Sequence, residues 1–454
     1  MPERERVIVV GGGITGLTTA LTLAQRSDHQ LEVELWEADE RLGGKLLTTP
    51  FAGLPAVDEG SDAFLARVPE AGALAAEVGL GDDLTSPTGA RAAVWHRGLH
   101  PIPDGVLLGV PAGVGSLASS GLLSRLGKLR AALEPFLPRT STAGDAIGAL
   151  VRRRFGDEVH ERLVDALIGS IYAADTDRSS LAAVPQLAAL AEHRSLLLGA
   201  RRTRAAGPPA AGPIFLAPRA GMGAFVGAVA DAASAGGVRI RSGRRVTELA
   251  RDGSSWRVDG ESADVVVLAT PAAPTAPLLH VVAPEAGRLL GTMDHAGVIL
   301  MTLHVPAWPD RLLDRSGYLV PKPVQGVVTA ASFGSQKWAH WRPPAGGEVL
   351  RVSLGRDGNA VDDLDDEQAL QQAVREVGRH LELDLQPVEW RVSRWPGGFP
   401  QYRPGHLDWR ARVETALPAG LYVTGASYGG IGVPACIAQG RATADRVLAH
   451  LRSG

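Results

Sequence analysis

The sequence predicts an α/β chain in which a parallel-sheet domain carries a strand-rich second domain and a mainly helical insertion. Residues 7–10 form a short apolar run that leads into a glycine-rich turn and a helix-compatible stretch over 17–25, as expected of a buried parallel strand and its crossover helix. Residues 31–37 alternate like a second strand, so the chain opens with a βαβ unit. Helical spacing then dominates 104–204, and strand signals return after residue 238.

The composition is that of an ordinary multidomain globular protein. At 454 residues the chain is too long for one simple core, and two or three domains are expected. A net charge of −3 gives no global reason to expect a nucleic-acid partner. Cys436 is the only cysteine, which excludes an intrachain disulfide and a cysteine-based metal cluster. We therefore predict no bound metal, and a reducing cytoplasm fits best.

Neither a signal peptide nor a membrane span is expected. The first residues, Met-Pro-Glu-Arg-Glu-Arg, lead directly into a strand. No run approaches the roughly 18 consecutive apolar residues needed to cross a bilayer. Two arginine clusters, at 152–154 and 201–202, fit either peripheral contact with an acidic membrane surface or a solvated helix surface, and both alternatives stay open.

The remaining elements follow from periodicity and turn residues. Helices are expected at 122–137, 145–155, 158–171, 181–198, 365–381 and 434–451, with a connecting loop at 201–213. Strands are expected at 238–241, 245–249, 255–258, 264–269, 297–305, 317–320, 326–332, 348–354 and 420–424. We assign 1–85, 212–288 and 412–454 to the parallel-sheet domain, 86–103 and 289–411 to the strand-rich domain, and 104–211 to the helical insertion.

The turn from Gly11 to Gly16 matches the G-x-G-x-x-G pattern of a Rossmann-like dinucleotide site. The string alone is weak in a chain with 55 glycines, but here it follows a strand and opens a helix. Gly11 permits the tight turn, Gly13 lets the backbone approach a pyrophosphate, and Gly16 allows close helix–strand packing. Glu37 ends the second strand, where a carboxylate accepts hydrogen bonds from an adenosine ribose. The alternative is a solvated strand-end carboxylate.

The next strings resemble the second glycine motif of FAD oxidases related to amine oxidases, and nicotinamide dehydrogenases do not normally carry them. They are ADERLGGK at 38–45 and VDEGSD at 57–62, followed by ATP at 269–271. The resemblance implies that Arg41 and Lys45 approach the phosphates or the ribityl chain and that the 60–62 turn lies beside the flavin. It also implies that the Val246 main chain meets the adenine, and that the 425–434 turn opens a helix toward the pyrophosphate and isoalloxazine.

FAD is therefore the expected cofactor, bound without a covalent link. Cys436 is a candidate for such a link, which some amine oxidases have, but its place inside the last helix favours a small core residue. The cofactor-binding residues that the motifs and the resemblance assign are Gly11, Gly12, Gly13, Ile14, Thr15, Gly16, Glu37, Ala38, Arg41, Gly44, Lys45, Gly60, Ser61, Asp62, Ala63, Val246, Trp395, Ile431, Gly432 and Val433. Trp395 fits ordinary core equally well.

Strings along the whole chain resemble one family closely, the soluble bacterial HemY-type oxidases of haem biosynthesis, also called coproporphyrinogen III oxidases. The strings are GGGITGL (11–17), ERLGGK (40–45), EGSDAFLAR (59–67), RRFGDEV (153–159), GSIYAAD (169–175), HRSLLLGARRTR (193–204), FPQYRPGH (399–406) and TGASYGGIGVPACIAQG (424–440). Those at 169–175, 193–204 and 424–434 distinguish this family from amine oxidases. Asp58, Glu59, Ser61 and Ala174 depart from the usual pattern, which leaves details of the substrate pocket open.

The resemblance implies a six-electron oxidation of a porphyrinogen in three two-electron steps. The flavin would take each hydride, and O₂ would reoxidise it and yield peroxide. The protein then has to position and desolvate the substrate, while the cofactor performs the chemistry. The sequence shows no obvious acid/base pair or nucleophile motif, so we assign no catalytic side chain.

Candidate substrate residues come from the same strings. Ile171 corresponds to a position that lines the pocket in the family, although it and Tyr172 also fit a helix core. Arg67, Arg204, Arg219 and Lys337 are candidate partners for propionates, although each also fits a solvated surface charge.

Several functions stay open beside coproporphyrinogen III oxidation. Protoporphyrinogen IX is the alternative substrate. An amine or carotenoid oxidoreductase would use the same FAD frame, and a flavin or porphyrin carrier would use the same fold without turnover. The expected partners are a porphyrinogen and O₂, with transient contact to a ferrochelatase as a further expectation.

Overall fold

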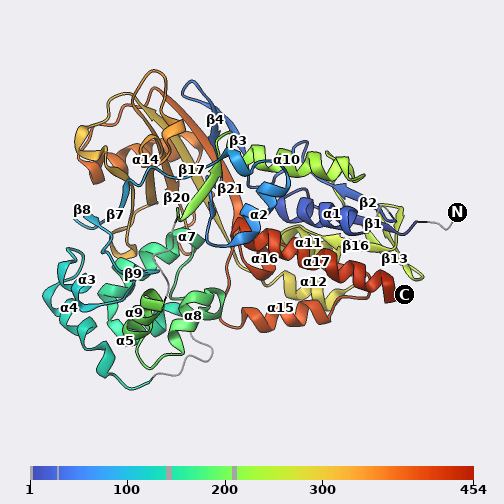
Figure 1. Cartoon of the computed structure of the whole chain (residues 1–454), viewed down its shortest axis with the longest axis horizontal. Helices are drawn as coiled ribbons and strands as arrows, with labels where there is room; N and C mark the ends of the chain where they lie inside the picture. Colours follow the sequence, from blue (N-terminus) through green and yellow to red (C-terminus); the bar gives the residue numbers. More distant parts are fainter. Residues whose placement is uncertain (1–3, 28–29, 140–145, 207–211, 454) are drawn as a thin grey trace.

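The computed structural model describes residues 4–27, 30–139, 146–206 and 212–453, and it contains two large sheets and a group of helices (Figure 1). The first sheet has five parallel strands in the order β12–β2–β1–β16–β22. The strands are β1 (Arg6–Val10), β2 (Glu32–Trp36), β12 (Arg239–Arg241), β16 (Val265–Leu268) and β22 (Leu421–Val423). The beginning, middle and end of the chain therefore meet in one sheet.

Both faces of this sheet are covered, which explains the uninterrupted apolar runs of its strands. Val7 and Val9 pack into a core with one set of helices, while Ile8 and Val10 point to the opposite face. The first face carries α1 (Ile14–Arg26), α10 (Met222–Ala235) and α17 (Val433–Ser453). The second carries the antiparallel strands β13 (Leu249–Asp252), β14 (Ser255–Val258) and β15 (Glu261–Ala263) with helices α11 (Ala272–Leu278) and α12 (Pro284–Leu290). The predicted βαβ opening is confirmed.

The second sheet has seven strands in the order β21–β17–β20–β19–β18–β7–β8, of which only the β18–β7 pair is parallel. Helix α14 (Asp366–Leu381) packs on one face and starts at a capping box, in which the Asp365 carboxylate accepts from the Gln368 N–H. The strands are β7 (Arg91–Trp95), β8 (Leu99–Pro101), β17 (His295–Val305), β18 (Arg315–Leu319), β19 (Val328–Phe333), β20 (Glu348–Leu354) and β21 (Glu389–Pro400).

The helices between β8 and β11 (Phe215–Pro218) form a separate group with their own apolar core, drawn at the lower left of Figure 1. They are α3 (Val114–Ser119), α4 (Arg125–Ala132), the 3₁₀ helix η2 (Glu134–Phe136), α5 (Ile147–Phe155), α6 (Asp157–Val159), the π-helix η3 (His160–Gly169), α7 (Ser170–Tyr172), the 3₁₀ helix η4 (Leu181–Ala183), α8 (Pro185–Ala191) and α9 (Leu196–Ala206). Inside this group the Arg154 guanidinium pairs with the fully buried Glu134 carboxylate at 2.7 Å.

One helix expected in this region is divided, and another is continuous over 157–172 but is a π-helix in its middle. The helix expected at 181–198 is interrupted because Pro185 starts α8 and Ser195 caps α9, where its hydroxyl accepts from the Leu198 N–H at 3.1 Å. The helix expected at 158–171 begins with α6 and continues as a π-helix.

The strand expected at 245–249 is wrong, and the loop expected at 201–213 is wrong over 201–206. Residues 243–244 bond instead to the end of β2, with the Arg244 N–H donating to the Glu37 carbonyl O at 2.7 Å, and β13 begins only at Leu249. Residues 201–206 continue α9, because Arg and Ala are good helix formers and its buried leucines fix the inner face. Residues 207–211 of the expected loop lie outside the described residues.

Candidate functional site

The first glycine turn leaves one residue open to a ligand. Gly11 adopts φ of +108°, which favours glycine, and its carbonyl O lies only 1.9 Å from the place of a Cβ on Gly16. Gly12 is closed in by the Leu42 side chain. A Cβ on Gly13, in contrast, would meet no atom within 4 Å. The N-terminus of α1 is therefore accessible at Gly13, where backbone N–H groups can bind an anion.

Glu37 is more than a solvated strand-end carboxylate, because the turn holds it in place. The Gly12 N–H donates to its Oε2 at 2.6 Å, and the Asp39 N–H donates to its Oε1 at 2.9 Å. Each carboxylate oxygen keeps a lone pair for a ribose hydroxyl. The 241–244 segment bonds to residues 37 and 39, so the partly buried Val246 follows directly beside this strand end.

The second glycine motif folds back onto the first. The Gly43 N–H donates to the Gly12 carbonyl O at 2.9 Å, and Gly44 has φ of +56° with its Cβ position 3.7 Å from the Gly13 Cα. Arg41 holds this loop together, since its guanidinium donates to the Leu42 carbonyl O at 3.2 Å and to the Gly44 carbonyl O at 2.7 Å. Its approach to phosphates stays a prediction.

Lys45 lies in a recess of the protein. Its side chain is exposed to solvent, yet burial lowers the pKa of its ammonium, which is expected where protein atoms surround a group without closing over it. No acidic residue is close enough to raise this pKa. An anionic ligand would complement this ammonium.

The N-terminus of α17 faces the same recess. Cys436 lies in its first turn, and its buried sulfur contacts the carbonyl O atoms of Gly430 and Ile431 at 3.7 and 3.9 Å. Burial raises the pKa of this thiol, which also bonds to the Thr15 side chain at the start of α1. The first turns of α1 and α17 therefore adjoin. Gly432 leaves the start of α17 open, because the nearest atom to its Cβ position is 3.9 Å away.

Asp62 is bound by two cations, Lys337 at the end of the short helix Gly334–Lys337 and Arg351 on β20. Its Oδ2 accepts from the Lys337 Nζ at 2.7 Å and from the Trp338 Nε1 at 3.0 Å, and an Arg351 Nη1 lies 3.4 Å away. Burial alone would raise the pKa of Asp62, but Lys337 and Arg351 hold it well below its usual range. Lys337, predicted as a propionate partner, is thus already paired with a carboxylate.

The 59–63 turn also contacts β20 and β21. The Arg351 guanidinium donates to the Gly60 carbonyl O at 2.5 Å, and the Trp395 indole N–H donates to the Glu59 carbonyl O at 3.2 Å. The Trp395 ring lies 3.4 Å from the Cβ position of Gly60. The exposed Ser61 bonds to the Ala63 carbonyl O. Arg351 was not predicted, because a single arginine within an apolar strand resembles any surface charge.

A second recess lies between the helical group and the second sheet. Gly169, Ser170 and Ala173 line one wall, and Leu300 and Phe399 belong to the opposite wall. Ile171 is 54% exposed, so it is not a core residue. Tyr172 is partly buried against the helical core, and burial raises its pKa.

Tyr402 joins this recess to the flavin-motif turn before α17. Its hydroxyl donates to the Ala426 carbonyl O and accepts from the Gly430 N–H at 2.9 Å. It also lies close enough to Tyr172 and Cys436 to influence them electrostatically. Tyr402 was not predicted as a site residue, although it stands in the FPQYRPGH string.

Three of the four predicted cations lie around one short strand pairing. Ile214, next to β11, accepts from the Ala66 N–H beside Arg67, and Arg219 follows β11 directly. Lys337 lies 5.9 Å from the centre of the Phe215 ring of β11. The side chains of Arg67 and Arg219 are exposed. Arg204 is separate, because it lies on α9.

The residues present fit a flavin dinucleotide. The open backbone at Gly13, the oriented Glu37 carboxylate and the Lys45 ammonium suit the pyrophosphate and ribose. The 60–62 turn under Trp395 offers a flat surface for an aromatic ring. Fold and site together define a flavoprotein.

The comparisons agree with this class. The family model for flavin-containing amine oxidoreductases matches residues 14–448, and the chain belongs to this family. It is 31% identical over 476 residues to the coproporphyrinogen III oxidase of Bacillus subtilis (strain 168), with 99% of each chain covered. It is 35% identical to the coproporphyrinogen III oxidase of Mycobacterium bovis, with 97% of each chain covered.

A solved structure agrees along the whole chain. A protein described as a protoporphyrinogen oxidase from Exiguobacterium sp. 255-15 superposes with a TM-score of 0.86 at 28% identity, covering 99% of each chain. The predicted resemblance and the prediction of a flavin-dependent oxidoreductase are confirmed.

Gly13→Val should abolish flavin binding, because its side chain would fill the open approach at the start of α1. The measurement is the ratio of flavin absorbance to protein absorbance in the purified protein. Gly227→Val is the matched control, since Gly227 lies on α10 with open space around its Cβ position. A Gly13→Val protein with the flavin content of the control would show that the cofactor does not approach this turn.

Proposed function

We propose that this protein oxidises coproporphyrinogen III to coproporphyrin III with O₂ as the acceptor. The observation that carries the proposal is the full-length similarity to coproporphyrinogen III oxidases, which extends beyond the flavin motifs into both walls of the second recess. When bound, the flavin supplies the hydride acceptor for each of the three two-electron steps. Protoporphyrinogen IX is the alternative substrate, and an amine substrate is the alternative class.

The protein's own contribution is to place the macrocycle and to exclude water. Gly169 and Ala173 on one side and Leu300 and Phe399 on the other form apolar walls. Tyr402 fixes the 426–430 turn between this recess and the flavin motifs. We assign no side chain as a general base, because loss of a pyrrole proton accompanies aromatisation of the ring.

We propose FAD as the flavin. The Glu37 carboxylate and the adjacent Val246 segment form an adenosine-side surface, which FMN could not use. The Cys436 thiol lies in the core and contacts backbone carbonyls, which supports a cofactor held without a covalent bond.

Acid precipitation of the purified yellow protein should release all of the flavin, and chromatography should identify it as FAD. Non-covalent binding is the reason, since denaturation then removes every contact that holds the cofactor. Yellow colour in the precipitate, or FMN in the supernatant, would contradict this.

The preference between the two porphyrinogens should depend on exposed arginines that can bind propionates. Coproporphyrinogen III carries four propionates and protoporphyrinogen IX carries two, so the tetra-acid needs additional partners. Arg67 and Arg219 lie beside β5 (Phe64–Leu65) and β11, and their guanidinium groups are exposed. Lys337 is already paired with Asp62, and we therefore favour the two arginines.

Coproporphyrinogen III should be oxidised with higher kcat/KM than protoporphyrinogen IX, and Arg67→Ala or Arg219→Ala should reduce the difference. A charge-assisted hydrogen bond contributes about 1.5–3 kcal/mol, which corresponds to about tenfold or more in selectivity. The matched control is Arg257→Ala, an exposed arginine on β14 paired with Asp252. Equal rates for both substrates in every variant would refute the coproporphyrinogen preference and leave the family assignment intact.

Helix α4 favours peripheral contact with an acidic membrane. Its outer face exposes Leu126, Leu129 and Leu133, followed by Phe136, at 79%, 59%, 47% and 80%. No acidic residue occurs in 105–133, whereas Arg125, Lys128 and Arg130 do. Apolar side chains flanked by cations complement an anionic lipid surface. In the part of the chain that the structure describes, no helix has the length and apolarity of a membrane span.

The protein should sediment with vesicles that contain phosphatidylserine but not with pure phosphatidylcholine vesicles at low ionic strength. Changing Leu126, Leu129 and Phe136 to Ser should abolish sedimentation, since both insertion and orientation of the cations would be lost. Val388→Ser, at an exposed position on the second domain, is the control. Absence of wild-type binding to the acidic vesicles would rule out this contact.

The remaining expectations are proposals about cellular context. The single cysteine supports a reducing compartment such as the cytoplasm. Transient contact with a ferrochelatase would pass a poorly soluble porphyrin to the next enzyme.

A further inference from the structure

The backbone that follows the π-helix is tied to the neighbouring sheet. We call residues 169–176 the turn segment. Gln401, just after β21, places its side-chain Nε2 3.4 Å from the carbonyl O atoms of both Tyr172 and Ala173. The N–H of Asp357, just after β20, donates to the Ala173 carbonyl O at 2.8 Å. The sheet therefore fixes the turn segment through its main chain.

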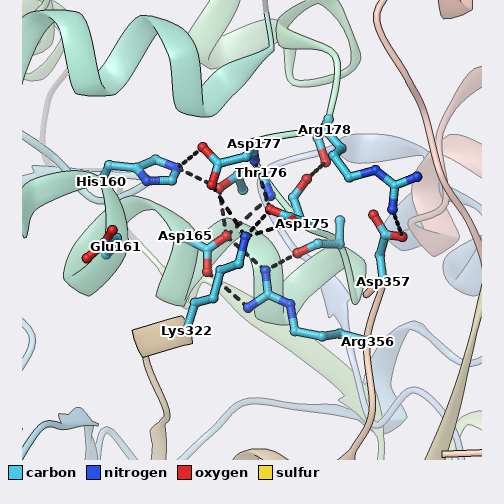
Figure 2. Close-up of polar contacts among 12 residues, drawn as sticks. His160, Glu161, Asp165, Asp175, Thr176, Asp177, Arg178, Lys322, Arg356 and Asp357 are labelled. Carbon is cyan, nitrogen blue, oxygen red and sulfur yellow. Dashed lines mark hydrogen bonds and ion pairs between the residues drawn. The ribbon is translucent and has the colours of Figure 1, made fainter. Parts of the chain in front are cut away.

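The strongest tie is a buried ion pair between the π-helix and the sheet (Figure 2). The Arg356 guanidinium binds both oxygens of Asp165, at 2.9 Å and 2.8 Å, and also donates to the Ala174 carbonyl O. Asp165 is fully buried and Arg356 is 5% exposed. The same carboxylate accepts from the Thr176 hydroxyl at 2.6 Å and from the Thr176 N–H at 3.2 Å. The Arg356–Asp165 pair thus bonds to Ala174 within the turn segment and to Thr176 at its end.

The turn segment needs such support because its conformation is strained. Ala173 adopts φ of +46° and ψ of +39°, a left-handed conformation that costs a non-glycine residue free energy and persists only where the surroundings determine it. Ile171 and Tyr172 lie immediately before it. They are flanked by Ser170 and Ala173, which both line the second recess, so their orientation depends on the bonds that keep Ala173 left-handed.

Arg356 lines the second recess, yet it is not suited to bind a substrate carboxylate. Its charge is already neutralised by Asp165. Burial alone would raise the pKa of Asp165, but the contact with Arg356 lowers this pKa by more, so the carboxyl stays ionised. A buried pair of this kind contributes little net stability but specifies one geometry.

We propose that Arg356 is a positioning residue for porphyrinogen oxidation, which through Asp165 and the Ala174 carbonyl sets Ile171 and Tyr172 against the substrate. This inference rests on the proposed function. It assigns to Arg356 the geometry of the recess wall, not contact with the reacting atoms.

The surrounding charges are more exposed and provide a control. Lys322 donates to both oxygens of Asp175 at 2.7 Å, and it also approaches Asp177 at 3.3 Å. Its side chain is 39% exposed, so solvent screens these pairs. Lys322→Met therefore removes a cation that reaches the same loop without removing a backbone tie.

The test compares Arg356→Met, Arg356→Lys, Asp165→Asn and Gly169→Ala with wild type and Lys322→Met, all as flavin-loaded enzyme. A Cβ on Gly169 would lie 2.5 Å from an Arg356 Nη and 2.9 Å from the Ala174 carbonyl O, so this variant displaces the pair while both charges remain. Measurements are flavin content, kcat and KM for coproporphyrinogen III, the affinity for coproporphyrin III by fluorescence quenching, and hydrogen exchange in residues 169–176.

Arg356→Met and Gly169→Ala should keep wild-type flavin content, lose about tenfold or more in kcat/KM, bind coproporphyrin III more weakly and exchange faster in residues 169–176, since small misplacements of a positioning wall cost about this much or more. Arg356→Lys should restore part of the activity, because it keeps the charge but not the two-point contact. Lys322→Met should match wild type. If one of the four variants that alter the Arg356–Asp165 pair does not fold, the other three still test the positioning role of Arg356.

Failure of this inference differs from failure of the proposed function. Wild-type enzyme that oxidises coproporphyrinogen III, with variants that match it in kcat/KM and product affinity, would overturn the positioning role alone. Wild-type enzyme without this activity would refute the proposed function. In that case unchanged hydrogen exchange in the Arg356→Met and Gly169→Ala variants would also overturn the structural part of the inference.

Discussion

The close packing of α1 against α17 is the constraint on which the flavin site depends. A Cβ on Gly440 would lie 2.7 Å from the Thr15 carbonyl O, and the Thr19 hydroxyl donates to the Gly440 carbonyl O at 3.2 Å. These helices begin at Ile14 and Val433, so the contact joins two ends of the chain at one point. Their unpaired N–H groups and positive dipole ends then lie beside the same recess. Any side chain at Gly440 would separate them.

Charged groups that hold the fold together differ from the charged group that faces the cofactor site in whether they have a partner within the chain. The carboxylates of Asp62, Asp165 and Glu134 each bind an arginine or lysine of the same chain, so these charges are paired within the protein. Lys45 differs, because its ammonium lies in a recess and burial lowers its pKa without an acidic partner among the causes. An uncompensated cation in such a position is unfavourable unless a ligand supplies the anion. The bound cofactor is therefore part of the electrostatic balance of this domain.

The sequence predicted local features well and distant contacts poorly. The strand at 348–354 and the capped helix beginning after Asp365 agree with the structure, because their periodicity and cap residues are local signals. The twelve-residue strand β21 was not predicted, since Pro396, Gly397 and Gly398 interrupt its pattern and its pairing with β17 is non-local. The glycine turn was recognised from its context.

The residues that the second sheet contributes to the site also could not be predicted from local sequence signals. Arg356, Arg351 and Gln401 act through partners that are distant in sequence, and no spacing rule connects such residues. Conversely, Lys337 was predicted as a free cation because its partner Asp62 lies 275 positions away. Residue type alone could not distinguish a paired cation from an available one.

Burial keeps four titratable side chains near the site neutral. Burial lowers the pKa of His295 and brings that of His406 to about 4, and it raises the pKa values of Tyr172 and Tyr402. All four groups are therefore uncharged near neutral pH. A neutral wall would suit the apolar body of the tetrapyrrole that we propose as substrate, whereas its carboxylates would be better accommodated by the solvated arginines beside β5 and β11. Because these four groups supply no charge near neutral pH, their contribution to the proposed oxidation is to place the ring. A rigid left-handed turn held by a self-neutralised ion pair is a suitable means for this, since it fixes geometry without adding charge to the interior.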